Sequence, residues 1–126
     1  MLFEHYALNV LNPKEMAQWY VSYLGLEVVS QQKEAPFMTF LADASHRVVM
    51  ELYHRPDAEI TDFKKMHHLT FHMAFISENA EVDKNRLMAQ GASFLEEVNK
   101  EDGSHLIMLR DPWGIPLQLC QRTHKL

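Results

Sequence analysis

The chain has 126 residues, a hydrophobic content of 47%, a charged content of 23% and a net charge of −5. These values predict one globular domain over residues 1–126 that buries its own core, and no cluster of lysine and arginine offers a surface for a nucleic acid. The single cysteine, Cys120, excludes an internal disulfide framework. No stretch reaches the roughly 20 apolar residues of a membrane helix, and the N-terminal residues lack the basic region of a signal peptide. We therefore expect a cytoplasmic protein without membrane partners.

The first half of the chain predicts four strands and one helix. Apolar and β-branched runs predict strands at residues 3–10, 26–31, 37–42 and 47–53. The helix lies between the first two runs. Asn12 can cap its N-terminus, Pro13 suits the first helical position and Glu15 completes a pattern that resembles a capping box. Gly25 ends the helix, after apolar residues at helical spacing: Met16, Trp19, Tyr20, Tyr23 and Leu24.

A polar connection over about residues 55–68 leads to a second copy of the same order. A strand at 69–76 is followed by a helix over about 78–90 that Gly91 ends, and then by strands at 93–98, 105–110 and 116–122. Each half therefore reads β-α-β-β-β. We interpret the chain as two modules within one domain, over about residues 1–54 and 69–126.

Four polar residues occupy matching places in the two modules. His5 in H-Y-A-L and His72 in H-M-A-F are 67 positions apart, and so are Glu51 in M-E-L and Gln118 in L-Q-L. An equal offset at both ends of a module indicates an internal repeat. Because side chains alternate across a strand, all four fall on the face opposite the apolar residues that would receive a helix. A carboxylate inside an apolar strand needs a partner, so we expect Glu51 to face a site that the two halves share.

The pattern resembles the vicinal oxygen chelate superfamily, which includes glyoxalase I, extradiol dioxygenases, methylmalonyl-CoA epimerase, and fosfomycin and bleomycin resistance proteins. The resemblance covers essentially the whole chain. It depends on His5, on W-Y-V-S-Y-L-G-L at 19–26, on T-F-H-M-A-F around His72 and, most specifically, on D-P-W-G-I-P-L-Q-L at 111–119. It implies an α+β fold in which two βαβββ modules form a cupped eight-stranded mixed sheet, with the helices on its outer face.

The resemblance also implies one divalent metal, with ligand positions that fall on His5, Glu51, His72 and Gln118. Two imidazoles, a carboxylate and an amide oxygen suit Zn, Ni, Co, Mn or Fe. Gln118 departs from the glutamate that is usual in the family. A hydrogen-bonding role in the pocket is therefore the alternative to ligation for this residue.

Such a site implies a metal-dependent enzyme of the glyoxalase type, a lyase, isomerase or epimerase that acts on a small oxygen-chelating substrate. Because an amide cannot accept a proton, Glu51 is the predicted catalytic base. Two alternatives stay open. One is a small-molecule or drug-binding resistance protein without catalysis, and the other is an Fe(II) extradiol-type dioxygenase that uses His5, His72 and Glu51.

Further residues are candidates for substrate contact. Met38, Phe40 and Met108 are expected to line an apolar pocket, with a core role as the alternative, and Arg110 is expected to bind an anionic substrate, with a surface charge as the alternative. His67 and His68 are interpreted as exposed loop residues. Family members commonly pair, so we expect a homodimer with a small-molecule substrate as its other partner.

Overall fold

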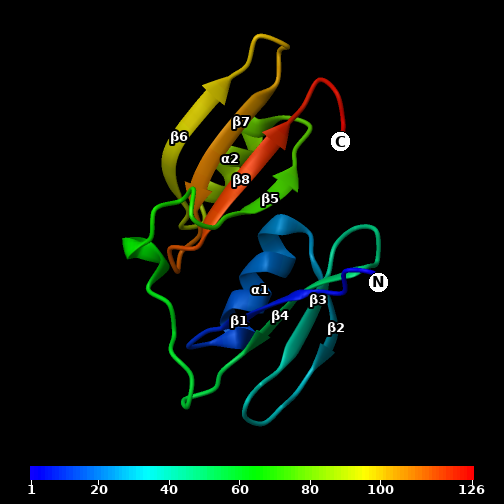
Figure 1. Ribbon diagram of the computed structural model, residues 1–126, viewed down its shortest axis with the longest axis vertical. Helices are drawn as coiled ribbons and strands as arrows, with labels where there is room; N and C mark the ends of the chain where they lie inside the picture. The colour runs from blue at the N-terminus through cyan, green and yellow to red at the C-terminus, as the bar shows by residue number, and fades with distance from the viewer. The chain divides into compact units, whose positions relative to one another are not determined.

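The computed structural model describes residues 1–126, which divide into two compact units, Met1–Thr61 and Asp62–Leu126 (Figure 1). Each unit contains a strand, a helix and three further strands in that order, so the prediction of an α+β fold with two βαβββ modules is confirmed. The hydrogen-bonded sheets have four strands each. Their union into one cupped sheet of eight strands stays a prediction. Neither helix has the length and apolarity to cross a membrane.

The first unit is a mixed four-stranded sheet with one helix. Its elements are β1 Tyr6–Asn9, α1 Pro13–Leu24, β2 Glu27–Gln31, β3 Thr39–Ala42 and β4 Val48–Tyr53. The strand order is β1-β4-β3-β2, in which β1 runs parallel to β4 and the other pairs are antiparallel. The parallel pair needs a crossover, and α1 with β2 and β3 provides it.

The signals at both ends of α1 act as the sequence predicts. The Asn12 side chain accepts a hydrogen bond from the Glu15 backbone N–H at 3.2 Å and donates one to the Glu15 carboxylate at 3.0 Å. The first of these bonds satisfies the Glu15 N–H, one of the donors that a helix N-terminus otherwise leaves unbonded. At the other end Gly25 adopts φ +71°, a left-handed conformation that terminates the helix.

The second unit repeats the architecture after a short 3-10 helix, η1, at Phe63–Lys65. Its elements are β5 Met73–Ile76, α2 Ala80–Met88, β6 Ser93–Asn99, β7 His105–Arg110 and β8 Pro116–Gln121. The strand order β5-β8-β7-β6, with β5 parallel to β8, has the same pattern as the first sheet. Asn79 caps α2, and its side chain accepts from the Val82 N–H at 3.1 Å.

The first strand of each module begins later than predicted. The expected strand 3–10 is observed as Tyr6–Asn9, and the expected strand 69–76 as Met73–Ile76. In the second module the Thr70 N–H donates to the His67 carbonyl at 2.9 Å, which closes a turn where a strand was expected. His5 and His72 therefore lie immediately before their strands rather than within them.

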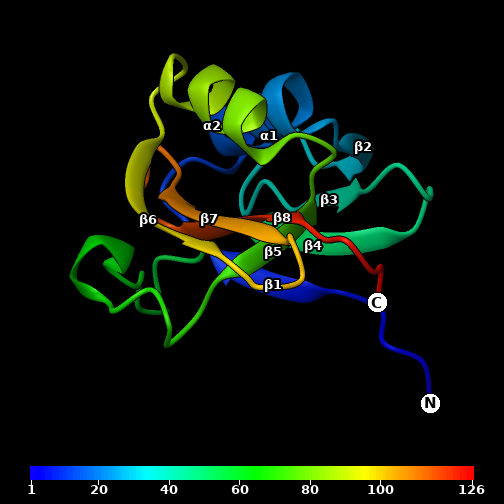
Figure 2. The same cartoon turned by 90° about the horizontal axis from the view of Figure 1, so that it is seen from above.

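One face of each sheet carries the core. The helix α1 packs on β2, β3 and β4, and α2 packs on β6, β7 and β8, each on one side of its sheet (Figure 2). Met50 and Leu52 on β4 are at most 1% exposed, and Ile107 and Leu117 are fully buried in the second unit. Burial of one such side chain contributes about 1.5–3 kcal/mol. This helix-covered face leaves the opposite face of each sheet for Glu51 and Gln118.

The D-P-W-G turn between β7 and β8 is built around a buried carboxylate. The Asp111 carboxylate accepts hydrogen bonds from the Trp113 N–H at 3.0 Å and from the Ile115 N–H at 2.8 Å. Gly114 adopts φ +91° and lies against Lys64, so a side chain at this position would be strained and would crowd the Lys64 backbone. The turn fixes where β8 begins, and with it the position of Gln118.

Candidate functional site

Glu51 and His5 lie together on the open face of the first sheet. In the register of this sheet Glu51 has Ala7 of β1 on one side and Phe40 of β3 on the other. The Glu51 carboxylate is 3.2 Å from His5 Nε2, and the two side chains are 12% and 23% exposed. The structure therefore supplies the partner that a carboxylate inside an apolar strand requires.

The His5 ring is held in place but has one unsatisfied nitrogen. The Phe40 ring meets it edge to face, with centroids 5.3 Å apart. His5 Nδ1 lies 3.2 Å from the Glu4 carboxylate without the alignment of a hydrogen bond, and it is buried without any hydrogen-bond partner. A buried polar atom without a partner costs about 1–3 kcal/mol. The other ring nitrogen, Nε2, is the one beside Glu51, so the ring presents Nε2 to the open face of the sheet.

A cavity of about 280 Å³ opens beside Glu51. It is lined by Pro36, Met38, Tyr53, Arg55 and Ala58 in addition to Glu51. The Asn9 side chain shapes one wall, because it donates to the Arg55 carbonyl at 2.9 Å and to the Ala58 carbonyl at 3.0 Å. The predicted pocket residue Met38 thus shares a cavity with the predicted base, while Phe40 contacts His5.

An exposed ion pair stands at the rim of this cavity. Arg55 Nη2 is 2.9 Å from the Asp57 carboxylate, and hydrogen bonds from Arg55 hold the pKa of the Asp57 carboxyl below its ordinary value. The same contact raises the pKa of Arg55. Both groups therefore stay charged at neutral pH at the entrance.

The other two predicted ligands belong to the second unit. Gln118 lies on β8 between Ala74 of β5 and Met108 of β7, and its amide oxygen accepts a weak hydrogen bond from the Cys120 thiol at 3.3 Å. Burial raises the pKa of that thiol, so it stays protonated. His72 precedes β5, is half-buried, and takes part in none of the hydrogen bonds or ion pairs. Its imidazole is therefore available as a ligand.

The remaining two predicted substrate contacts differ in environment. Met108 is 2% exposed and is the register neighbour of Gln118. The Arg110 guanidinium donates to the carbonyls of Phe63 at 2.7 Å, Met66 at 2.8 Å and Gly114 at 2.9 Å. These bonds join η1 to the D-P-W-G turn, so a bound anion would have to displace them. The substrate-binding role of Arg110 stays a prediction.

A comparison with known protein families gives a match over nearly the whole chain. The sequence profile described as Glyoxalase/Bleomycin resistance protein/Dioxygenase superfamily matches residues 2–119. The chain belongs to this superfamily. The resemblance inferred from His5, His72 and the D-P-W-G segment is thereby confirmed at the level of the superfamily.

Solved structures of the superfamily have the same fold. An antibiotic-binding protein, TnmS3 from Streptomyces sp. CB03234, matches with a TM-score of 0.72 at 14% identity, over 98% of this chain and 97% of that chain. Lactoylglutathione lyase from Agrobacterium tumefaciens matches with a TM-score of 0.65 at 18% identity, over 94% and 92%. At these identities the similarity shows the fold alone. A search of curated proteins found no match.

A histidine-glutamate pair on the Gln118 face was missed by the sequence reasoning. Glu96 of β6 pairs in register with Met108, which in turn pairs with Gln118. The His68 imidazole is 2.7 Å from the Glu96 carboxylate, and its side chain is only 15% exposed. His68 is therefore not the exposed loop residue that was expected. Its separation of 28 positions from Glu96 gave no local signal.

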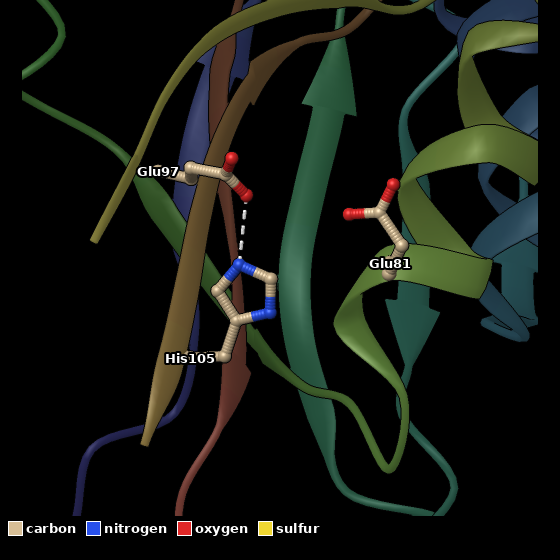
Figure 3. Close-up of side chains that lie close together, drawn as sticks. All are labelled: Glu81, Glu97 and His105. Atoms are coloured by element: carbon tan, nitrogen blue, oxygen red, sulfur yellow. Dashed lines mark hydrogen bonds and ion pairs between the residues drawn. The ribbon is translucent and has the colours of Figure 1, made fainter. Parts of the chain in front are cut away.

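A second cluster, formed by Glu81, Glu97 and His105, lies on the helix-covered face (Figure 3). Glu97 pairs in register with the buried Ile107 and is 2.8 Å from His105 Nε2, while Glu81 approaches from α2. The ligand atoms lie within 4.8 Å of one another. Lys84 Nζ is already 2.7 Å from Glu81 and holds the pKa of its carboxyl below the ordinary value. The cluster is a local ion network on the opposite side of the sheet from Gln118.

Proposed function

We propose that this superfamily member is a divalent-metal-dependent enzyme of the glyoxalase-like type, a lyase, isomerase or epimerase that acts on a small oxygen-chelating substrate. In this proposal His5, Glu51, His72 and Gln118 hold the metal. One observation carries it: His5 Nε2 and the Glu51 carboxylate, both on half-buried side chains, lie 3.2 Å apart on the open face of the first sheet. An imidazole nitrogen and a carboxylate oxygen are two donor types that divalent metals prefer.

The donor set fits a borderline divalent ion. An imidazole and a carboxylate already lie 3.2 Å apart in the first unit, and His72 and Gln118 complete the set by the family resemblance. Nitrogen and oxygen donors without thiolate suit Zn, Ni, Co, Mn or Fe. When bound, the metal would supply a Lewis acid that polarises a substrate carbonyl and lowers the energy of the adjacent carbanion.

The protein's own residues would provide binding and proton transfer. The cavity beside Glu51 offers a small substrate the apolar side chain of Met38 and a carboxylate that is 12% exposed. Glu51 is the proposed base, because Gln118 cannot accept a proton. The Glu96 carboxylate, paired with His68 on the face that carries Gln118, is the alternative candidate base.

Substitution of Glu51 by glutamine tests this assignment. Glu51→Gln keeps the size and an oxygen donor but removes basicity, so we expect metal content to be largely retained and proton abstraction to fall roughly 10²- to 10⁴-fold. The measurement is solvent deuterium exchange at the carbon next to the carbonyl, with 2-oxoaldehyde hemithioacetals and acyl thioesters as substrates. Metal is quantified on protein purified without a histidine tag.

A matched control is available in the same unit. Glu27 also pairs with a histidine, His46, at 3.3 Å, but this pair is exposed. Glu27→Gln should leave exchange unchanged. Undiminished exchange in Glu51→Gln would exclude Glu51 as the base and make Glu96 the next residue to substitute. Protein that holds no divalent metal under any loading condition would refute the metal-dependent proposal.

The second candidate is a binding protein without catalysis, and Gln118 favours it. The amide replaces the family's usual carboxylate, and its oxygen already accepts from the Cys120 thiol. The same fold occurs in a protein described as antibiotic-binding. Metal-loaded protein that binds ligands but shows no exchange with any substrate would favour this candidate. An Fe(II) extradiol-type dioxygenase would instead consume oxygen with a catechol.

A further inference from the structure

A larger cavity lies wholly within the unit Asp62–Leu126. Its volume is about 540 Å³, inside the roughly 300–1,000 Å³ typical of sites for small organic molecules. The end of β5, the end of β8 and the segment that follows β8 line it, and this segment curves beside the end of β5 in Figure 1. Ala74 and Cys120 are among the lining residues, so the cavity reaches the sheet face that carries Gln118.

The cavity has an apolar wall that the protein leaves in contact with solvent. Ile76, the last residue of β5, lines it and is 81% exposed. Phe75 and Leu126 also line it, and Leu126 is fully exposed. Apolar side chains at a concave site provide contact area for the apolar part of a ligand.

Two cationic residues lie on the wall of this cavity. Arg122 and Lys125 line it together with the Glu78 carboxylate and with Leu126, the last residue of the chain. Neither cation forms an ion pair in the structure. The other four arginines donate to a carbonyl or a carboxylate: Arg47, Arg55, Arg86 and Arg110. Arg122 interacts only with the Cys120 thiol, a weak acceptor.

We propose that this cavity binds a small amphipathic carboxylate, with the Arg122 guanidinium on the carboxylate and the apolar chain against Ile76 and Leu126. Guanidinium matches a carboxylate with two parallel hydrogen bonds, and charge-assisted bonds of this kind are roughly twice as strong as neutral ones. Lys125 adds attraction at the rim. This binding requires neither the metal nor Glu51, so its test is independent of the test of the proposed catalytic function.

The test compares octanoate with octanamide, which has the same chain and a neutral head. Both are titrated into the ¹⁵N-labelled full chain, and dissociation constants are taken from amide shifts. We expect the shifts to centre on Ser77, Cys120 and Arg122, and we expect octanoate to bind about tenfold more tightly, which corresponds to about 1.4 kcal/mol. Arg122→Gln should remove this difference between the two ligands.

Two further variants separate the head group from the chain. Ile76→Ser should weaken octanoate and octanamide alike, because it removes apolar contact. Arg86→Gln is the matched control, since Arg86 lies on α2 and pairs with Asp83, and it should leave both dissociation constants unchanged. Equal affinity of the wild-type protein for the two ligands would overturn the proposal. The proposal would also be overturned if the amide shifts were confined to residues outside the cavity. The same holds if a second copy of the chain occupied the cavity and prevented any amide shift.

Discussion

Gly114 and Gly25 both adopt positive φ, yet their surroundings differ. A Cβ on Gly25, at φ +71°, would meet nothing within 4 Å. A Cβ on Gly114, at φ +91°, would lie against the Lys64 side chain and 3.1 Å from the Lys64 backbone nitrogen. The side chain of Lys64 can move away, but its backbone is fixed where η1 meets the D-P-W-G turn. Gly114 therefore faces both a conformational and a steric restriction.

We predict that alanine at these two glycines separates the two restrictions. Gly25→Ala should cost about 1–2 kcal/mol for the left-handed backbone alone. Gly114→Ala should cost a further 1–3 kcal/mol or so, because the added methyl group overpacks against Lys64. Urea denaturation of both variants measures the difference as a lower midpoint with unchanged slope. Equal midpoints would show that η1 does not pack against this turn.

Arg110 illustrates what residue type alone could not predict. An arginine next to an apolar strand is compatible with an anion site, with a free surface charge and with a backbone clamp. Only the path of residues 62–67 decides among them, since the carbonyls of Phe63 and Met66 reach the guanidinium. This connection has no periodic pattern, and its contacts with β7 are non-local.

At the scale of single elements, the two helices have side-chain N-caps of the same kind. The Asn12 amide oxygen accepts from the N–H three residues on, and the Asn79 amide oxygen does the same at α2. Asn12→Ala should destabilise the protein by about 1 kcal/mol, whereas Asn12→Asp should stay close to the wild type, because aspartate accepts the same bond and favours a helix N-terminus. Thermal unfolding measures the change. Equal losses in both variants would contradict the capping role.

The helices and most strands were predictable because their signals are local. Caps, glycine stops and alternation fixed α1, α2 and six of the strands within a few residues. The errors fall at β1 and β5, where the residues before each strand have strand-like composition. The turn that ends with the bond from Thr70 to His67 overrides that composition. The secondary-structure propensities of single residues do not predict such a turn.

The candidate site was predictable only in part, for a related reason. The 67-residue offset and the alternation of faces identified His5 and Glu51, which the structure brings together. The pairs His68–Glu96 and Glu97–His105 depend on the register of β6. The pairing of β6 with β7 contains a register shift, as does the pairing of β2 with β3. A register shift of one residue exchanges the two faces of a strand. Their partners therefore could not be read from spacing.

At the scale of the whole molecule, one edge strand of each sheet, β2 in the first and β6 in the second, leaves apolar side chains in solvent. All five residues of β2 are exposed, with Val28 at 45% and Val29 at 57%, and on β6 Phe94 and Val98 are 42% and 48% exposed. β2 and β6 each contain a bulge, which disfavours addition of a further strand at their edges. If a partner covers these residues, it does so through side-chain packing rather than by extension of a sheet.

We therefore predict a homodimer with an isologous contact that includes Val29. Light scattering after size-exclusion chromatography at micromolar concentration should give twice the 14.7 kDa of one chain. Val29→Lys should shift the mass toward the monomer, because it places a charge in the apolar contact. Val82→Lys is the matched control, since Val82 is 59% exposed on α2, and it should leave the dimer intact. A wild-type mass near 14.7 kDa would refute the dimer, and a Val29→Lys dimer as stable as the wild type would place the contact on another surface.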